Sequence, residues 1–363
     1  MKHCSKCGMP DTRPGSIFGS NGICQACLNY ESRKDVNWQE REEELRKLCD
    51  KYRKTDGSYD CIIPVSGGKD SHFLAHIMIE EMNMHPLLVT VTDSFTHTEA
   101  GAHNLRNMIE TFKLNHYQYT INHDLFRRAT RIAFETTGEA LKFVEYAIYT
   151  IPTLLAQKFD IPFVIYGENS SFEYGTVSED FFSATPVVKA MSDKLEEDRQ
   201  WWIDHGLTDP EVSSIQLDNS KPLPEVIYMS YFYPWSSMRN LEVARRYGFR
   251  DLAHEWKREG CIEDFEQMDS QAYMVHLWLK YPKFGFQRTS DIASRRVREG
   301  LITLDEAKRL IREIDPNLDQ IAMVDFISFL GYTQKQFWDI VEKMWNREIF
   351  EQKDSRWVLK NPL

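Results

Sequence analysis

The hydrophobic and polar positions in the first half of the chain follow two alternating periods. Short apolar runs predict β-strands at 60–65, 86–93, 116–121 and 162–168. Apolar residues that recur every three or four positions predict helices at 69–84, 98–112, 123–137 and 144–159. Regular alternation of strands and helices is typical of an α/β fold with a mostly parallel sheet and right-handed crossovers.

The pattern changes at both ends of this region. A charged segment with Leu45 and Leu48 on one face predicts a helix at 38–52. After Ala184 the alternation stops, prolines interrupt the chain at 222 and 224, and the remainder is helical and aromatic-rich. Capping boxes at 303–306 and 333–336 predict two helix starts there. We therefore expect a mostly helical C-terminal region.

Composition and charge narrow the class of protein. The 363 residues are 42% hydrophobic, enough for one large α/β domain with accessory parts. The net charge of -11 opposes a general nucleic-acid surface, so no nucleic-acid partner is expected. The sequence contains no apolar run of about 18 residues, the length that a membrane span needs, and the first residues do not resemble a signal peptide. We expect a cytoplasmic protein with no membrane partner.

Four cysteines near the N-terminus have the spacing of a metal site. Cys4, Cys7, Cys24 and Cys27 form a C-x2-C-x16-C-x2-C pattern. Four thiolates fit a closed, structural Zn²⁺ site, which leaves no position for a catalytic water. An iron–sulfur cluster also suits four cysteines, and disulfides are a third alternative that a reducing cytoplasm disfavours.

A glycine-rich segment follows the first predicted strand. Val65 precedes Ser66-Gly67-Gly68-Lys69-Asp70-Ser71, which opens the helix predicted at 69–84. Unpaired N–H groups at a helix start stabilise oxyanions, and glycine lets the backbone approach a phosphate closely. The spacing differs from a Walker motif. We predict that Val65 to Ser71 bind the phosphates of ATP.

Polar residues also follow two other predicted strands. They are Thr92-Asp93 and Gly167-Glu168-Asn169. Ligands of parallel sheets bind beyond the carboxyl ends of the strands, so we expect all three strand ends to meet at one nucleotide site. Asp70 and Glu168 are predicted to hold Mg²⁺, because hard cations prefer carboxylates shared with phosphates. Lys69 is predicted to neutralise phosphate charge, which makes Lys69, Asp70 and Glu168 the candidate catalytic residues.

The glycine-rich segment resembles the PP-loop of the ATP pyrophosphatase family, matching its Ser-Gly-Gly-x-Asp-Ser fingerprint at all five fixed positions. The resemblance implies an adenine nucleotide alpha hydrolase-like fold and cleavage of ATP to AMP and pyrophosphate. With it, the sequence predicts a zinc ribbon at 1–35 and a helical linker at 36–58. A PP-loop domain follows at 59–184, and a helical region at 185–363 completes the substrate site.

Motifs along nearly the whole chain resemble the N-acetyl sugar amidotransferases of bacterial surface-glycan synthesis. Besides the cysteines and the PP-loop, they are the segments 9–15, 167–169, 173–175 and 283–288. The resemblance implies conversion of an acetamido group, on an activated sugar or nonulosonic acid, to an acetamidino group. ATP adenylates the amide oxygen and ammonia displaces AMP. The candidate acceptor-binding residues are Glu173, Tyr174, Lys283 and Arg288; a surface ion pair is the alternative for Arg288.

The source of ammonia is predicted to be another protein. Position 2 is Lys2, which excludes an N-terminal cysteine nucleophile, and neither Cys61 nor Cys261 lies in a nucleophile elbow. The family resemblance implies a separate glutaminase with a cyclase-like barrel partner, similar to the pair used in histidine biosynthesis.

Two other functions remain open at this stage. A PP-loop tRNA-modifying enzyme also combines a zinc ribbon with adenylation, although the chain is acidic and has no further C-x-x-C pair after the linker, where only Cys61 and Cys261 occur. A noncatalytic scaffold that senses nucleotide is the third possibility. Tryptophans at 201, 202 and 235 could stack on a sugar, but the sequence favours the core for all three.

Overall fold

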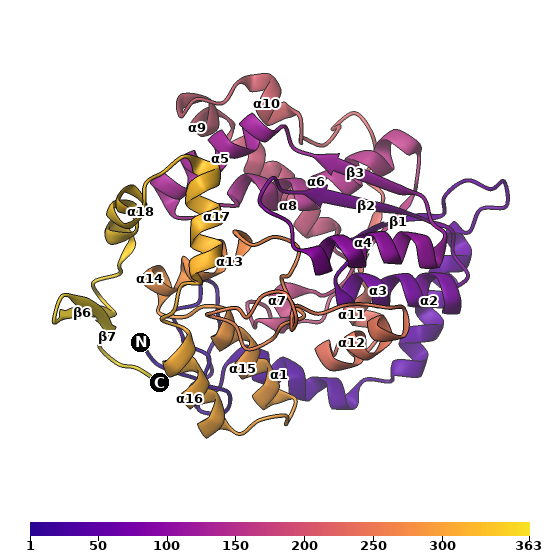
Figure 1. Ribbon diagram of the computed structural model, residues 1–363. Helices are drawn as coiled ribbons and strands as arrows, with labels where there is room; N and C mark the ends of the chain where they lie inside the picture. The colour runs from indigo at the N-terminus through magenta and orange to yellow at the C-terminus, as the bar shows by residue number, and fades with distance from the viewer.

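A five-stranded parallel sheet forms the centre of the protein (Figure 1). The computed structural model describes all residues from 1 to 363. The strands have the spatial order β3-β2-β1-β4-β5. The chain therefore adds β2 and β3 on one side of β1, and β4 and β5 on the other. The α/β class with a parallel sheet is confirmed. The strands are β1 (Cys61–Pro64), β2 (Pro86–Thr92), β3 (His116–Thr120), β4 (Phe163–Tyr166) and β5 (Glu225–Tyr228).

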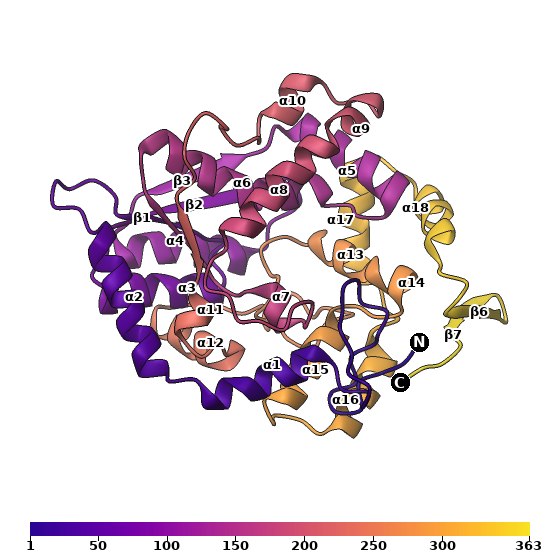
Figure 2. The same cartoon turned by 180° about the vertical axis from the view of Figure 1, so that it is seen from behind.

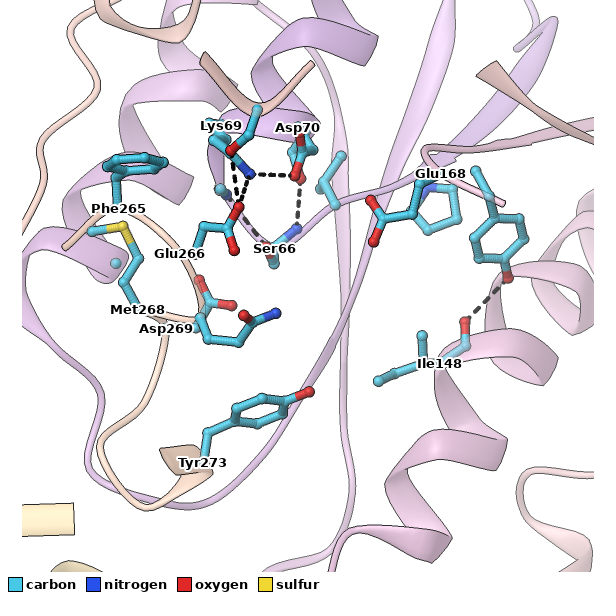
Figure 3. Close-up of a pocket in the computed structure, with 18 of the residues that line it drawn as sticks. Ser66, Lys69, Asp70, Ile148, Glu168, Phe265, Glu266, Met268, Asp269 and Tyr273 are labelled. Carbon is cyan, nitrogen blue, oxygen red and sulfur yellow. Dashed lines mark hydrogen bonds and ion pairs between the residues drawn. The ribbon is translucent and has the colours of Figure 1, made fainter. Parts of the chain in front are cut away.

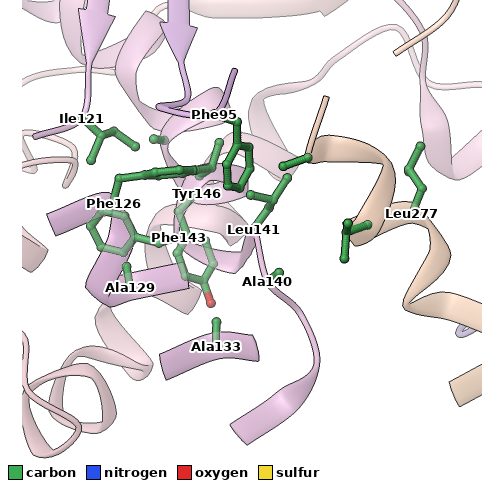
Figure 4. Packing of buried hydrophobic residues seen from close by; sticks show 14 of the residues in the cluster. Phe95, Ile121, Phe126, Ala129, Ala133, Ala140, Leu141, Phe143, Tyr146 and Leu277 are labelled. Carbon is green, nitrogen blue, oxygen red and sulfur yellow. The ribbon is translucent and has the colours of Figure 1, made fainter. Parts of the chain in front are cut away.

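Helices cover both faces of the sheet because neighbouring side chains of each strand point to opposite sides. Ile62 and Val89 face the larger hydrophobic core, whereas Ile63 and Leu88 face the smaller one. The larger core includes α5 (His123–Thr137), α6 (Lys142–Phe159) and α8 (Thr185–Glu197). Figure 4 shows part of it, where Phe126 packs beside Phe95. The smaller core includes α2 (Trp38–Tyr52), α3 (Lys69–His76), α4 (Glu99–Phe112) and α12 (Ser237–Arg246).

The predicted helices of the first half are confirmed, with small changes at their ends. Thr98 caps α4 and accepts a hydrogen bond from the Gly101 N–H at 2.9 Å. The helix that follows the PP-loop ends as α3 at His76 and continues as a π-helical segment, η2 (Ile77–Glu81).

The N-terminal segment packs against the domain through α1 (Gln25–Ser32), which begins directly after Cys24. Asn29 donates hydrogen bonds to the Phe172 and Val177 carbonyl oxygens at 2.7 and 3.0 Å. A short η1 (Arg33–Asp35) then leads into α2. These contacts fix the cysteine-containing segment beside α7 (Ser170–Glu173).

The C-terminal region is mostly helical as expected, and both capping boxes are confirmed at Thr303 and Thr333. The sequence did not predict strand β5, which completes the sheet beyond position 184, or the hairpin of β6 (Phe350–Lys353) and β7 (Arg356–Leu359). The other helices are α9 (Arg199–Asp204), α10 (Asp209–Ser213), α11 (Met229–Phe232), α13 (Tyr273–Trp278), α14 (Lys280–Phe284), α15 (Arg288–Arg298), α16 (Leu304–Ile314), α17 (Gln320–Leu330), α18 (Gln334–Val341) and η3 (Glu342–Met344).

The C-terminal helices meet the N-terminal segment on the side of the molecule away from β3 (Figures 1 and 2). Both chain termini lie there, beside α16. None of the helices combines the length and the apolar character needed to cross a membrane.

Candidate active site

A cavity of about 410 Å³ lies at the carboxyl ends of β1, β2 and β4 (Figure 3). This is the point where the strand order reverses, the usual ligand position in an open parallel sheet. The structure brings together the three strand ends that the sequence singled out. Their lining residues are Val65, Ser66, Gly68, Lys69, Asp70, Ser71, Thr92, Asp93 and Glu168.

The PP-loop takes its shape from Gly67 and from two serine hydroxyls. Gly67 has a φ of +88°, and a Cβ there would lie 2.6 Å from the Leu105 backbone nitrogen. Ser71 Oγ accepts a hydrogen bond from the Ser66 N–H at 3.1 Å, and Ser66 Oγ accepts one from the Gly68 N–H at 3.3 Å. No side chain caps α3, so the N–H groups of its first turn are available to an anion.

Substitution of each of the two glycines by alanine should show which of them the backbone of the loop requires. Gly67→Ala should lower the free energy of unfolding by about 1–3 kcal/mol, because alanine is strained at positive φ and its Cβ meets the Leu105 backbone. Gly68→Ala is the matched control: its φ is -66°, and the nearest atom to an added Cβ is Ser66 Oγ at 3.3 Å. Urea denaturation of both variants measures the difference. Equal stability would contradict the account of the loop.

Lys69 is nearly enclosed and has two carboxylate partners. Its Nζ lies 2.8 Å from Asp70 Oδ2 and 3.0 Å from Glu266 Oε1. Burial alone would lower the pKa of Lys69, but the two carboxylates outweigh burial and raise it above its usual value. Asp70 Oδ1 accepts a further hydrogen bond from Asn240 Nδ2 at 2.7 Å. Lys69 therefore stays charged, and Asp70 is held in one orientation.

Glu266 joins the two ends of the cavity. This carboxylate is 5% exposed, and besides Lys69 it pairs with Arg295 at 2.8 Å and with Arg288. Burial raises the pKa of Glu266, but the three cations reverse that effect and hold the pKa well below its usual range. One ionised glutamate thus ties the PP-loop lysine to the arginines of α15.

Two other carboxyl groups of the cavity are easier to protonate. Burial, together with the nearby Asp70 charge, raises the pKa of Glu168 to about 7. Burial and the nearby Asp93 charge raise the pKa of Asp269 to about 7. Figure 3 shows Glu168 opposite Glu266 and Asp269, across the cavity. Asp70 and Glu168 could share a divalent cation, because both face the same space beside the phosphate-binding loop.

Residues of three distant motifs meet at the far wall of the cavity, where Tyr174 and Arg288 line it and Arg13 packs behind Tyr174. The Arg13 guanidinium lies over the Tyr174 ring, 4.4 Å from its centroid, and over the Phe286 ring at 4.7 Å. Arg288 Nη1 donates to the Tyr174 hydroxyl at 3.0 Å. Arg13 also pairs with Asp291 of α15. The segments 9–15, 173–175 and 283–288 therefore meet in space.

The candidate acceptor-binding residues differ in their placement. Glu173, Tyr174 and Arg288 line the cavity, although Glu173 is paired with Arg33. Arg288 is only 7% exposed, which rules out the surface ion pair considered from the sequence. Lys283 does not reach the cavity: its Nζ donates to the Gly138 carbonyl oxygen at 2.9 Å and connects α14 to the turn after α5. An acceptor contact is therefore not available to Lys283.

Three predicted nucleotide-site residues shape the loops without lining the cavity. Gly67 packs against the backbone of α4, and Gly167 packs against Trp235. Asn169 is buried; its Oδ1 accepts a hydrogen bond from the Phe172 N–H at 3.2 Å and caps α7. Trp235 lines the cavity close to these residues, so the prediction from the sequence that it is a core residue is wrong. Trp202 is a core residue as expected, packed against Phe143.

Several cavity residues were not found from the sequence. Glu266 and Asp269 lie in an irregular segment between α12 and α13, where no periodicity marks them. The acidic run from 263 to 269 was the one available signal. Tyr273, Arg295 and Arg298 also line the cavity, from α13 and α15.

The four N-terminal cysteines form a closed cluster. Their sulfur atoms all lie within 4.8 Å of one another, with Cys4–Cys27 and Cys7–Cys24 distances of 3.8 and 3.6 Å. None forms a disulfide, and all four are buried. A tetrahedral ion with metal–sulfur bonds of about 2.3 Å would place its sulfurs roughly 3.8 Å apart. The donor set therefore fits one metal ion more closely than a multi-iron cluster, which needs a wider cage.

A comparison with family models finds a similarity in the C-terminal part of the chain. Residues 259–362 match the model described as "LPS biosynthesis protein WbpG-like, C-terminal domain". These residues are therefore similar to a WbpG-like domain. The matched segment contributes Glu266, Asp269, Arg288, Arg295 and Arg298 to the cavity. The match supports the family resemblance of the motif at 283–288, which lies within these residues.

Other similarities are more distant. The chain is 25% identical over 187 residues to an uncharacterized protein of Methanocaldococcus jannaschii, covering 48% of this chain and 62% of that protein. The chain thus spans about three fifths of the length of this curated relative.

Among solved structures, the NMN synthetase of Francisella tularensis is 9% identical, covering 83% of this chain and 96% of its own, with a TM-score of 0.34. The U34-tRNA thiolase NcsA of Methanococcus maripaludis, solved with its 4Fe-4S cluster, is 12% identical, covering 86% and 89%, with a TM-score of 0.34. At such scores, the fold assignment rests on the sheet and the PP-loop of this chain.

Proposed function

We propose that this protein is an ATP-dependent amidotransferase of the cytoplasm. It converts an acetamido group of an activated sugar or nonulosonic acid to an acetamidino group and releases AMP and pyrophosphate. The product would serve surface polysaccharide or flagellin glycan synthesis. One observation carries the proposal: a single cavity has the PP-loop on one side and, on the other, Tyr174 with the arginines of the segment that matches the WbpG-like model.

The reaction needs two displacements. In the first, the acetamide oxygen forms a bond to the α-phosphorus of ATP and pyrophosphate leaves. In the second, ammonia forms a bond to the acetamide carbon, AMP leaves with the former amide oxygen, and ammonia loses a proton. The first displacement requires that the phosphate charge is neutralised and that the acceptor oxygen is aligned with the α-phosphorus. A protein achieves this by electrostatic stabilisation and by positioning of the reactants.

The residues of the cavity divide between these tasks. Lys69 and the free N–H groups at the start of α3 would hold the leaving pyrophosphate. Asp70 and Glu168 would hold Mg²⁺, which supplies charge neutralisation when bound. Tyr174 and Arg288 would contact the acceptor. Thr92 and Asp93, at the end of β2, would bind the nucleoside part of ATP.

Zn²⁺ is the proposed occupant of the cysteine cluster. Cys4, Cys7, Cys24 and Cys27 supply four thiolates at the spacing of a single tetrahedral ion. Such a closed site stabilises the fold of its segment and leaves catalysis to the cavity.

Ammonia is proposed to come from a separate glutaminase that acts with a cyclase-like barrel subunit. The sequence offers no cysteine nucleophile for glutamine hydrolysis, and Cys61 is fully buried in strand β1. Free ammonium should therefore replace the partner in vitro.

Pyrophosphate release by the purified protein tests the proposed function. The assay contains Mg-ATP and ammonium chloride, with diacetamido sugars, nonulosonic acids or bulk tRNA as acceptors. Release that depends on an acetamido sugar supports the proposal. Release that depends on tRNA alone would assign the protein to the tRNA-modifying enzymes, and nucleotide binding without turnover on any acceptor would favour a scaffold.

Binding of Mg-ATP should depend on pH through Glu168. Its pKa of about 7 means that the carboxyl group is mostly protonated below pH 7 and ionised above it. A metal ligand must be deprotonated, so the affinity should rise between about pH 6 and about pH 8, by up to tenfold per unit below the pKa. Glu168→Gln should bind more weakly and lose this part of the slope. Titration calorimetry measures the affinity of both proteins against pH, and the ionisation of ATP cancels because it affects both equally. Identical slopes of affinity against pH would contradict the assignment of Glu168 as a metal ligand.

A further inference from the structure

We propose that Arg298 is a positioning residue that links the cysteine metal centre to the acceptor end of the cavity. Its guanidinium Nη1 lies 3.8 Å from Cys7 Sγ, and the same residue lines the cavity. This inference depends on the proposed function in one respect: the end of the cavity that Arg298 lines is called the acceptor site. The link between metal and cavity stands on the contacts themselves.

Arg298 differs from the other arginines of the cavity in its partner. Arg33 pairs with Glu173, Arg288 with Glu266, and Arg295 with both Glu263 and Glu266. Arg298 has no carboxylate within ion-pair distance, and Cys7 Sγ is its hydrogen-bond partner. Four thiolates around a divalent ion carry a net negative charge. A neighbouring cation that donates an N–H to sulfur stabilises that charge and fixes its own position.

Two elements of the cavity wall start or end at the metal centre. Helix α15 carries Arg288 and Arg295 into the cavity and ends with Arg298 against the thiolates. Helix α1 begins directly after Cys24 and contains Cys27; Tyr30 and Arg33, one and two turns later, line the cavity. A bound ion therefore holds α1 and the last turn of α15 together at the acceptor end.

The nucleotide end is built from other elements. The PP-loop joins β1 to α3, and α3 packs mainly against α12. Loss of the metal should thus loosen the acceptor wall and leave the PP-loop in place. Because Arg298 donates to a cysteine of the metal centre, loss of its guanidinium should also weaken metal binding.

The first test measures metal affinity. Co²⁺ competition against a chelator, followed by the thiolate charge-transfer band, compares wild type with Arg298→Gln, Arg298→Lys and the control Arg309→Gln. Arg309 is an exposed arginine of α16 paired with Glu313. Arg298→Gln should lose about 10–100-fold in metal affinity, as for other groups that contact metal ligands. Arg298→Lys should lose less, and the control nothing. Unchanged affinity in Arg298→Gln would overturn the proposal.

The second test locates the effect without any acceptor. Amide hydrogen exchange is compared between the full-length metal-loaded protein, the metal-stripped protein and metal-loaded Arg298→Gln. Stripping should raise exchange in residues 28–33 and 295–299 and leave 66–76 unchanged; Arg298→Gln should reproduce the increase at 295–299. An increase confined to residues 1–27, or one that extends through the PP-loop, would overturn the proposal. Failure of acceptor turnover in the pyrophosphate assay would affect neither readout.

Discussion

Asp70→Asn should lower the rate of acceptor-dependent pyrophosphate release by about 10²–10³-fold, the usual loss when one group that stabilises transition-state charge is removed. Asparagine has the same shape and can keep the contact with Asn240, now 2.7 Å from Asp70 Oδ1. It cannot supply a carboxylate to Mg²⁺ or a full ion pair to Lys69. The effect should therefore fall on kcat and nucleotide binding, with little change in the free energy of unfolding.

Asp124→Asn is the matched control for this substitution. Asp124 is also the second residue of a helix, α5, and also pairs with basic side chains, Arg127 and Arg128. It lies outside the cavity. If both variants lose activity equally, the effect of Asp70→Asn comes from the helix start and not from the nucleotide site.

Glu266→Gln should destabilise the protein by about 3–5 kcal/mol, the usual cost of breaking a buried ion pair by removing one partner. Glutamine keeps the shape but leaves Lys69, Arg288 and Arg295 without their shared anion. Urea denaturation followed by tryptophan fluorescence measures the loss. Mg-ATP affinity should also fall, because Lys69 loses one of the two groups that orient it.

Glu313→Gln controls for the loss of a glutamate charge. Glu313 pairs with Arg309 on the exposed face of α16, and such surface pairs contribute about 0–1 kcal/mol. A Glu266→Gln variant as stable as Glu313→Gln would show that the buried arginines do not depend on this anion.

The sequence predicts the nucleotide end of the site well because its signals are local. An apolar run, two glycines and an amphipathic helix lie within about 25 consecutive residues, and each dictates its own backbone. The parallel sheet then brings the ends of β1, β2 and β4 together without further information. The cysteine cluster is equally local, since two tight pairs of ligands need little more than their spacing.

The acceptor end could not be predicted in the same way, because it depends on contacts between distant segments. Glu266 lies in an irregular segment, and its role follows only from three cations contributed by α3 and α15. Lys283 and Arg288 are five residues apart in one motif, yet α14 directs Lys283 to Gly138 and α15 directs Arg288 into the cavity. Strand β5 has four residues and follows β4 after a long helical connection, so the alternation that reveals the other strands is hidden.

The most direct test of the central claim follows the oxygen of the acetamido group. An acetamido sugar that supports pyrophosphate release is prepared with a heavy oxygen isotope in its acetyl carbonyl and incubated with the protein, Mg-ATP and ammonium. Mass spectrometry of the AMP and of the sugar reads the outcome. The account predicts that the heavy oxygen is found in AMP and that the sugar carries NH in its place. Unlabelled AMP, with the label retained in the sugar, would contradict adenylation of the acetamido oxygen.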